Sequence, residues 1–264
     1  MLNEIMVHKR DELERKRQVT PLADLKARAI TQPPALDFPG ALGGEGVRLI
    51  AEIKRASPSS GLLCTDFDPV RLARTYVVNG AAAISVLTDN RFFQGRLEDL
   101  AKVKQFLLRL GLAIPILRKD FIFHPYQVVE ARAAGADALL LIVSVLTDKM
   151  LADLLALTHH LGMAALIEVH SEEEVARALC LRPRVIGINN RNLQDLSVDL
   201  SGFERLSRLL PDEVSTVSES GVRTASDISR LGEMGADAVL VGEALVKARD
   251  TAAKTRELVT GGLP

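Results

Sequence analysis

A short apolar run, a polar turn, an amphipathic segment and a glycine recur in this order along most of the chain. Eight apolar runs follow one another: Val47–Lys54, Ala81–Thr88, Ala113–Lys119, Asp137–Ser144, Met163–His170, Val185–Asn190, Val214–Ser220 and Asp237–Gly242. Helical spacing marks the segments between and after them: Pro69–Asn79, Leu97–Leu110, Pro125–Ala134, Asp148–Leu161, Ser171–Leu181, Leu200–Leu210, Thr224–Met234 and Ala244–Leu258. Units of roughly 20–30 residues with this pattern are typical of a strand followed by a helix. The repeat therefore predicts a chain of β/α units.

The apolar runs are continuous and do not alternate in polarity. This pattern is typical of parallel strands that are buried on both faces. Eight such units predict an α/β fold with a closed (β/α)8 barrel, the TIM barrel. An open, doubly wound sheet is the alternative, but no glycine-rich dinucleotide loop follows the first run.

The first 46 residues differ from the repeat. Met1 to Ala29 has helical spacing among many charges, and Pro21 is suited to the first turn of a second helix. Thr31 to Gly46 is rich in proline and glycine and is predicted to be a connector. A segment of this length cannot bury a core of its own. We therefore expect residues 1–46 to form a helical extension packed on a barrel of residues 47–264.

Charge and composition exclude several classes of protein. The chain has 33 Lys and Arg against 34 Asp and Glu, so no basic surface points to a nucleic-acid partner. No apolar run is long enough to cross a membrane, and the charged N-terminus has no apolar leader. Cys64 and Cys180 lie far apart and the histidines form no cluster, so we expect neither a metal nor a cofactor. A cytoplasmic, monomeric protein is expected.

The segment from Val47 to Gly61 combines a strand with a polar turn. Glu52 and Lys54 fall on the same face of the strand, because side chains alternate along it. Burying a carboxylate and an ammonium there costs on the order of several kcal/mol per ion. This segment alone is compatible with a structural ion pair in a barrel and with part of an active site.

Polar residues collect at the carboxyl ends of the predicted strands. Six runs end in this way: at Glu52–Lys54, Arg118–Asp120, Glu168–His170, Asn189–Asn192, Ser218–Gly221 and Gly242–Glu243. In a (β/α)8 barrel these ends share one mouth, where active sites are built. The glycines after the last two strands predict a phosphate site. Lys119 could donate a proton, with a pKa that falls if Lys54 lies nearby, and Glu168 could accept one.

Longer sequence patterns surround these residues. They are Ala51–Ser59, Ser85–Thr88, Phe92–Gly95, Arg118–Phe121, Pro125–Gln127, Leu166–His170, Gly187–Leu193, Val217–Gly221 and Val241–Leu245. In this order and combination, together with the charged N-terminal extension, they resemble the indole-3-glycerol phosphate synthase family. The family carries out a ring closure in tryptophan biosynthesis, and the chain is similar to its monofunctional members.

The resemblance implies a reaction and a set of site residues. It implies that 1-(2-carboxyphenylamino)-1-deoxyribulose 5-phosphate is converted to indole-3-glycerol phosphate, carbon dioxide and water. It implies that Lys119 is the general acid and Glu168 the base. The other catalytic positions that it implies are Glu52, Lys54, Asn189 and Ser220. The substrate- and phosphate-binding positions that it implies are Ser57, Phe93, Phe121, Arg191, Glu219, Gly221, Gly242 and Glu243, with Ser220 also near the phosphate.

Some positions depart from the family pattern. The family often has Lys at Ser60, Ser at Arg96, Asp at His124 and Met at Val246. All four flank the expected site. The resemblance also implies that the N-terminal extension covers the mouth and that Ser57–Gly61 is a mobile lid.

Two other functions are compatible with a phosphate-binding barrel. One is an isomerase such as phosphoribosylanthranilate isomerase, which predicts a shorter chain and a Cys and Asp acid–base pair. Neither Cys64 nor Cys180 ends a predicted strand. The other is a barrel that binds phosphate ligands without catalysis or serves as a scaffold. A binder does not need the acid and base that Lys119 and Glu168 would supply.

Overall fold

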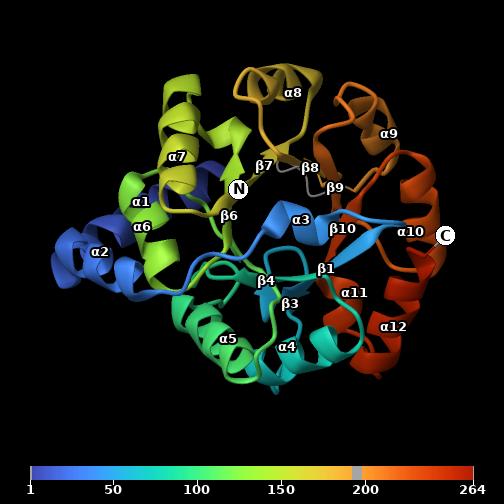
Figure 1. Ribbon diagram of the computed structural model, residues 1–264, viewed down its shortest axis with the longest axis horizontal. Helices are drawn as coiled ribbons and strands as arrows, with labels where there is room; N and C mark the ends of the chain where they lie inside the picture. Colours follow the sequence, from blue (N-terminus) through green and yellow to red (C-terminus); the bar gives the residue numbers. More distant parts are fainter. Residues whose placement is uncertain (1, 192–197, 264) are drawn as a thin grey trace.

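Eight parallel strands close into a barrel in the computed structural model, which describes residues 2–191 and 198–263 (Figure 1). The barrel strands are β1 (Arg48–Ile53), β4 (Ala83–Leu87), β5 (Ile116–Lys119), β6 (Ala138–Ile142), β7 (Ala164–Val169), β8 (Val185–Asn189), β9 (Ser215–Glu219) and β10 (Ala238–Val241). Neighbours pair in the order β1-β10-β9-β8-β7-β6-β5-β4, and β4 pairs with β1. The predicted (β/α)8 barrel is confirmed.

Helices surround the strands on the outside. They are α4 (Pro69–Val78), α5 (Leu97–Arg109), α6 (Pro125–Ala133), α7 (Asp148–His160), α8 (Glu172–Leu179), α9 (Ser201–Ser207), α10 (Ala225–Glu233), α11 (Glu243–Val246) and α12 (Thr251–Gly261), with a 3-10 turn at Val143–Val145. The last predicted helix, Ala244–Leu258, is divided into α11 and α12. Asp250 explains the break, because its carboxylate caps α12 by accepting the Ala253 N–H.

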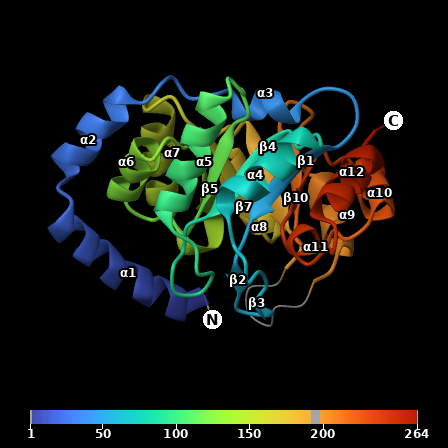
Figure 2. The ribbon, with the colours of Figure 1, turned by 90° about the horizontal axis from the view of Figure 1, so that it is seen from below.

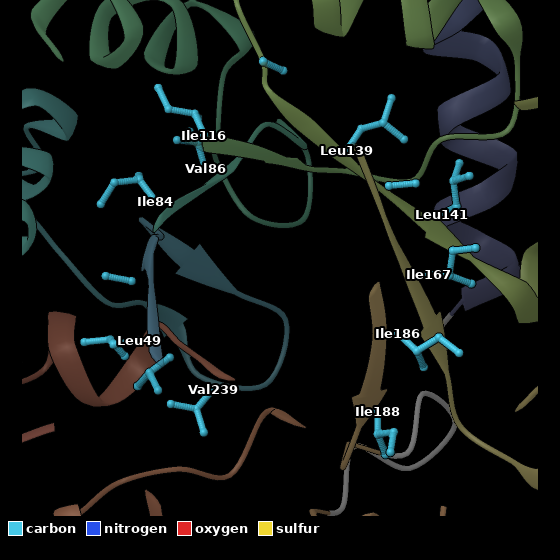
Figure 3. Close-up of a cluster of buried hydrophobic side chains, with 14 of the residues drawn as sticks. Leu49, Ile84, Val86, Ile116, Leu139, Leu141, Ile167, Ile186, Ile188 and Val239 are labelled. Carbon is cyan, nitrogen blue, oxygen red and sulfur yellow. The ribbon is translucent and has the colours of Figure 1, made fainter. Parts of the chain in front are cut away.

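Apolar side chains cover both faces of the barrel strands. The outward side chains include Leu49, Ile84, Leu139, Ile167 and Val239, which pack beneath the helices (Figure 3). The inward side chains include Ile50, Leu117, Leu140, Leu166, Val217 and Leu240. None of these side chains is more than 5% exposed. This two-sided burial explains why the apolar runs of the sequence are continuous.

Three helices precede the barrel: α1 (Leu2–Val19), α2 (Leu22–Thr31) and α3 (Phe38–Leu42). The third helix lies in Thr31–Gly46, so the prediction of a plain connector there is wrong. Phe38 and Leu42 are buried in the inward-facing core, and this contact stabilises a short helix that contains Pro39 and Gly40. Figure 2 shows α3 and the N-terminus at opposite ends of the barrel.

The outer side of the barrel carries the first two helices. Leu13 of α1 and Leu25 and Ala29 of α2 form a buried cluster with Tyr126 and Val129 of α6. The Tyr126 hydroxyl also donates a hydrogen bond to the Thr20 carbonyl. In the described part of the chain, no helix is both long and apolar enough to span a bilayer.

Candidate active site

A cavity of about 860 Å³ opens at the carboxyl ends of the barrel strands. Its apolar lining includes Leu140, Ile142 and Leu240. Its lining contains every site residue that the sequence analysis named: Glu52, Lys54, Ser57, Phe93, Lys119, Phe121, Glu168, Asn189, Arg191, Glu219, Ser220, Gly221, Gly242 and Glu243. Asn192, which also follows β8, and Leu193 lie outside the described residues. The barrel therefore brings together side chains from strands spread along the whole sequence.

Lys119 lies between two buried carboxylates. Its Nζ is 2.7 Å from Glu219 Oε2 and 3.1 Å from Glu168 Oε2. Burial alone would lower the pKa of Lys119, but the carboxylates of Glu219, Glu168 and Glu52 raise it above its ordinary value. The expectation that this pKa falls is therefore wrong, because carboxylates and not a second ammonium dominate its surroundings. Lys54 Nζ is itself 3.6 Å from Glu52 Oε1.

The two carboxylates beside Lys119 differ in their surroundings. Glu168 Oε1 accepts a hydrogen bond from Asn189 Nδ2 at 3.1 Å. Burial raises the pKa of Glu168, but Lys119, His170 and Asn189 together bring it below its ordinary value. Glu219 Oε1 is buried and has no hydrogen-bond partner among the described residues. Burial, with Glu168 and Glu52 nearby, raises the pKa of Glu219 to about 7 although Lys119 opposes the shift.

Two phenylalanines form an apolar wall of the cavity. The ring centroids of Phe93 and Phe121 are 6.3 Å apart, and the rings are tilted by 37°. Lys54 Nζ lies 5.6 Å from the centroid of the Phe93 ring, within the range of a cation–π contact. A flat aromatic ligand that carries a negative charge would find both an apolar surface and an ammonium here.

The ends of β9 and β10 are shaped by backbone geometry. Ser220 and Gly221 have φ values of 68° and 92°, in the left-handed region. Turns of this kind expose backbone N–H groups that can hold an anion. A Cβ atom at Gly242 would lie 2.3 Å from Glu52 Oε1. Glycine at this position therefore allows Glu52 to approach the backbone closely.

The polar segment after β1 folds back over the mouth as a hairpin. Its strands are β2 (Ala56–Ser57) and β3 (Gly61–Leu62), which pair antiparallel. The sequence analysis expected a polar turn that acts as a mobile lid here, and it did not predict the two short strands. Ser60 Oγ donates a hydrogen bond to Glu243 Oε1 at 3.1 Å, so the position at which the family often has Lys contacts the segment after the neighbouring strand β10.

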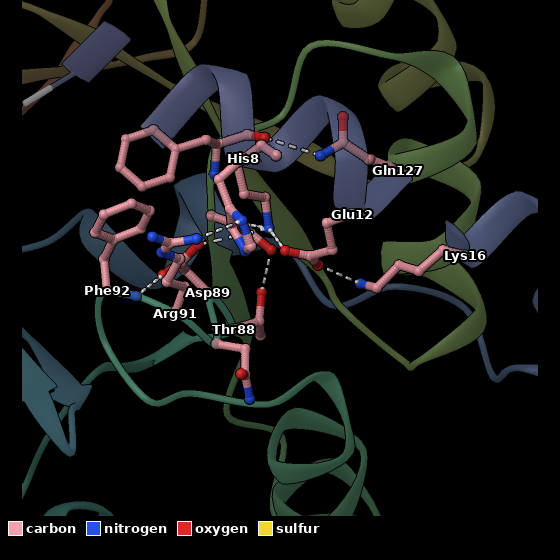
Figure 4. Close-up of polar contacts among 12 residues, drawn as sticks. His8, Glu12, Lys16, Thr88, Asp89, Arg91, Phe92 and Gln127 are labelled. Carbon is pink, nitrogen blue, oxygen red and sulfur yellow. Dashed lines mark hydrogen bonds and ion pairs between the residues drawn. The ribbon is translucent and has the colours of Figure 1, made fainter. Parts of the chain in front are cut away.

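Lys9 on α1 is a buried residue next to the site that the sequence analysis missed. Its side chain is 1% exposed, and its Nζ lies 2.9 Å from Asp120 Oδ1, 3.7 Å from Asp89 Oδ2 and 3.0 Å from Glu12 Oε2. Figure 4 shows Glu12 and Asp89 gathered with Thr88 between α1 and the end of β4. The sequence did contain an indication that Lys9 is buried. Lys9 lies four residues from both Ile5 and Leu13, on the apolar face of the helix.

These aspartates also hold the loops that carry the aromatic wall. Asp89 Oδ1 accepts hydrogen bonds from the backbone N–H groups of Phe92 and Phe93, and Asp120 Oδ1 accepts one from Phe121. Leu2 and Ile5 of α1 line the cavity directly. Over residues 2–191 and 198–263, no group of three or more His, Cys, Asp or Glu side chains could hold a metal ion.

Comparison with known proteins decides the family. The family model described as indole-3-glycerol phosphate synthase matches residues 2–258. The chain belongs to the indole-3-glycerol phosphate synthase family. This confirms the resemblance of the sequence patterns and removes the isomerase alternative.

Relatives named indole-3-glycerol phosphate synthase align over nearly their whole length. The protein of Roseiflexus sp. (strain RS-1) is 53% identical over 265 residues, which cover 99% of this chain and 98% of the relative. The protein of Roseiflexus castenholzii (strain DSM 13941 / HLO8) is 54% identical, with coverages of 98% and 97%. The protein of Dehalococcoides mccartyi (strain CBDB1) is 50% identical, with coverages of 98% and 100%.

Solved structures of low sequence identity share the fold. The 3-hexulose-6-phosphate synthase from Salmonella typhimurium superposes with a TM-score of 0.64 at 12% identity, covering 81% of this chain and 98% of its own. The thiamine phosphate pyrophosphorylase from Pyrococcus furiosus gives a TM-score of 0.61 at 17% identity, with coverages of 85% and 97%. These structural similarities show a shared barrel fold and nothing about function.

One departure from the indole-3-glycerol phosphate synthase pattern has a local explanation. His124, where the family often has Asp, is the N-cap of α6, and its Nδ1 accepts the Tyr126 N–H at 3.1 Å. Burial, with a contribution from Arg17, lowers the pKa of His124 and so favours the neutral imidazole that can accept this bond. The histidine therefore caps the helix, as an aspartate at this position could also do.

Proposed function

We propose that this chain is an indole-3-glycerol phosphate synthase of tryptophan biosynthesis. It closes the indole ring of 1-(2-carboxyphenylamino)-1-deoxyribulose 5-phosphate and releases carbon dioxide and water. The observation that carries this proposal is the position of Lys119 between Glu168 and Glu219 in the cavity of a chain that belongs to this family.

Ring closure needs an acid at the ketone. The aromatic carbon that bears the carboxylate attacks the carbonyl carbon, and negative charge develops on the carbonyl oxygen. We assign Lys119 as the acid that protonates this oxygen, because its two carboxylate partners keep it charged before the reaction. Loss of carbon dioxide then restores the aromatic ring.

Dehydration needs a base and a second proton. The ketone oxygen leaves as water, and the methylene carbon beside the nitrogen gives up one proton. We assign Glu168 as the base, because its pKa lies below its ordinary value and the carboxylate is ionised near neutral pH. Asn189 orients Glu168 by its hydrogen bond to Oε1.

The remaining lining residues position the substrate in this proposal. Phe93 and Phe121 hold the anthranilate ring, and Lys54, paired with Glu52, faces the carboxylate. The phosphate occupies the opposite side of the mouth. Its proposed partners are Ser57, Arg191, Ser220, Gly221, Gly242 and Glu243.

We further propose the organisation and setting of the protein. Residues 1–46 act as an extension that completes the mouth, and residues 47–264 act as the catalytic barrel. Two observations support this role of the extension. Leu2 and Ile5 line the cavity, and Lys9 forms an ion pair with Asp120 next to the site. We expect a cytoplasmic monomer that needs no cofactor and has no nucleic-acid or membrane partner.

A direct assay tests the function. The purified chain is incubated with the synthetic substrate in the presence of a metal chelator, and formation of indole-3-glycerol phosphate is followed by fluorescence. We expect turnover without added metal. Saturable binding of the substrate with no product would instead favour the non-catalytic phosphate-binding barrel.

A further inference from the structure

His170 lies beside the buried carboxylate of Glu168. It follows β7, its side chain is 16% exposed, and it does not line the cavity. Its Nε2 is 3.3 Å from Glu168 Oε1. Its Nδ1 is 3.4 Å from Glu174 Oε2, and the same Glu174 oxygen accepts the His170 backbone N–H at 2.8 Å. His170 therefore connects a buried site carboxylate with a partly exposed one on α8.

The protonation of His170 follows from these contacts. Its Nε2 is buried and makes no hydrogen bond among the described residues, and the Glu168 carboxylate lies within 3.3 Å of it. Burial alone would lower the pKa of His170, but the hydrogen bond to Glu174 and the carboxylates of Glu168 and Glu219 raise it. An imidazole that lies between two carboxylates, as His170 does, can accept a proton at one nitrogen and donate one from the other.

The proposed reaction consumes a proton. The ketone oxygen takes up two protons before it leaves as water, whereas the methylene carbon releases one. The carboxylate leaves as neutral carbon dioxide, so the charge balance also requires one proton from solvent in each turnover. Lys119 gives its proton to the ketone oxygen, and a second proton is needed while the intermediate still fills the cavity.

We propose that His170 is a proton-relay residue that delivers this second proton from solvent to Glu168 and so to Lys119, an inference that rests on the proposed function. The order of contacts is Glu174, His170, Glu168 and Lys119, joined at 3.4, 3.3 and 3.1 Å. Because His170 and Glu174 do not line the cavity, this route stays open when the substrate fills the mouth.

The steps of the relay balance. Protonated His170 gives the Nε2 proton to Glu168 Oε1, and a half-turn of the carboxyl group carries it to the side of Lys119 Nζ. Neutral Lys119 takes this proton and becomes an acid again. His170 regains its proton from solvent. His170 acts through Glu168 and does not touch the substrate, so it is a positioning residue and not a catalytic one.

The groups around His170 predict how the relay depends on pH. The carboxylates of Glu168 on β7, Glu174 on α8 and Glu219 on β9 act on it. Below pH 7 the Glu219 carboxyl group is protonated and lies close to Lys119, so it is a second proton donor for Lys119. Above pH 7 that source is lost, so dependence on His170 is greatest in this range.

The test uses the full chain and the synthetic substrate, with kcat and KM measured at pH 6 and pH 8. His170→Asn removes the titrating ring at similar size, His170→Ala leaves room for added imidazole, and His160→Asn on an exposed part of α7 is the control. We expect both His170 variants to lose at least about tenfold in kcat at pH 8 and less at pH 6, with KM within about twofold of the original chain. We also expect imidazole to restore His170→Ala in proportion to the imidazolium concentration.

Other outcomes separate the two proposals. An unchanged kcat at pH 8, or an equal loss at both pH values that imidazole does not restore, overturns the relay and leaves the proposed function intact. Absence of product with the original chain overturns the proposed function itself. Circular dichroism of each variant separates these results from a failure to fold.

Discussion

The ammonium nitrogen of Lys9 lies 2.9 Å from the carboxylate of Asp120, the residue that follows Lys119. The other Asp120 oxygen accepts hydrogen bonds from Thr88 at 2.7 Å and Arg118 at 2.9 Å. Arg118 is completely buried and also contacts Glu130 at 2.8 Å. The first helix of the chain is thus part of the ionic network beneath the end of β5.

Replacing Lys9 by Met should destabilise the protein and weaken substrate binding. The change leaves Asp89 and Asp120 buried beside each other without their ammonium, and breaking a buried pair typically costs about 3–5 kcal/mol. We expect a loss of that order in the free energy of unfolding from denaturant titration, with a higher KM. Lys16→Met, at a side chain that is 32% exposed, should cost about 1 kcal/mol or less. Equal losses in the two variants would contradict the role given to Lys9.

Replacing Lys119 by Ala should remove the proposed acid of ring closure. We expect kcat to fall at least about a hundredfold, because acid or base assistance is typically worth about 10²–10⁴-fold. Lys149→Ala, at a side chain that is 83% exposed, serves as the control and should leave kcat unchanged. Steady-state kinetics on folded variants measure both, and near-normal turnover of Lys119→Ala would refute the assignment.

Replacing Glu168 by Ala should also reduce kcat at least about a hundredfold. The variant lacks the proposed base and the partner of Lys119 at 3.1 Å, while the contact of Lys119 with Glu219 at 2.7 Å remains. Glu173→Ala, in the first turn of α8 and exposed, is a suitable control. A variant that keeps most of its turnover would mean that another group takes the proton.

Replacing Glu219 by Gln should stabilise the protein at high pH. The folded-state pKa of about 7 lies above the ordinary value of 4.5, so the folded protein holds a proton that the unfolded chain releases earlier. Stability is therefore lost as the pH rises from 4.5 through 7, and Gln avoids this loss. We expect a gain of about 2–3 kcal/mol in the free energy of unfolding at pH 8 and little gain at pH 5. A gain that is the same at both pH values would contradict this charge effect.

Replacing Gly242 by Ala should impair activity more than folding. The new Cβ would lie 2.3 Å from Glu52 Oε1, so Glu52 and its partner Lys54 must move. We expect kcat/KM to fall by about ten- to a hundredfold, as is usual when site groups are displaced. Gly202→Ala in α9 meets no atom within 4 Å and should keep full activity while stabilising the helix by about 0.5–1 kcal/mol. Equal kinetics for the two variants would show that Glu52 has room to move.

The barrel and the lining of its cavity could be predicted because both depend on local pattern. The continuous apolar runs identify the strands, and polar residues at the strand ends identify the mouth, so Lys119, Glu168 and Glu219 were found without knowledge of their distances. The pKa of Lys119 could not be predicted, since it depends on which neighbours face it. The sequence analysis considered Lys54, whereas the structure places Glu168 and Glu219 in contact.

The extension was the least predictable part. Helix α3 contains Gly40 and has Pro39 in its first turn, and the buried contacts of Phe38 and Leu42 with residues distant in the sequence stabilise it. The ion-pair partners of Lys9, Asp89 and Asp120, lie far from it in the sequence. No local pattern therefore reveals that the charge of Lys9 is neutralised.

Helix α3 packs against the inward-facing core at one end of the barrel. Phe38 and Leu42 close the interior at the end away from the cavity, so the described residues leave the strand-end mouth as the passage for reactants and products. In the proposed reaction, carbon dioxide, water and the phosphorylated product must all depart through the aperture that admits the next substrate. Entry and exit therefore compete, and the order in which the products leave can limit the throughput of the enzyme.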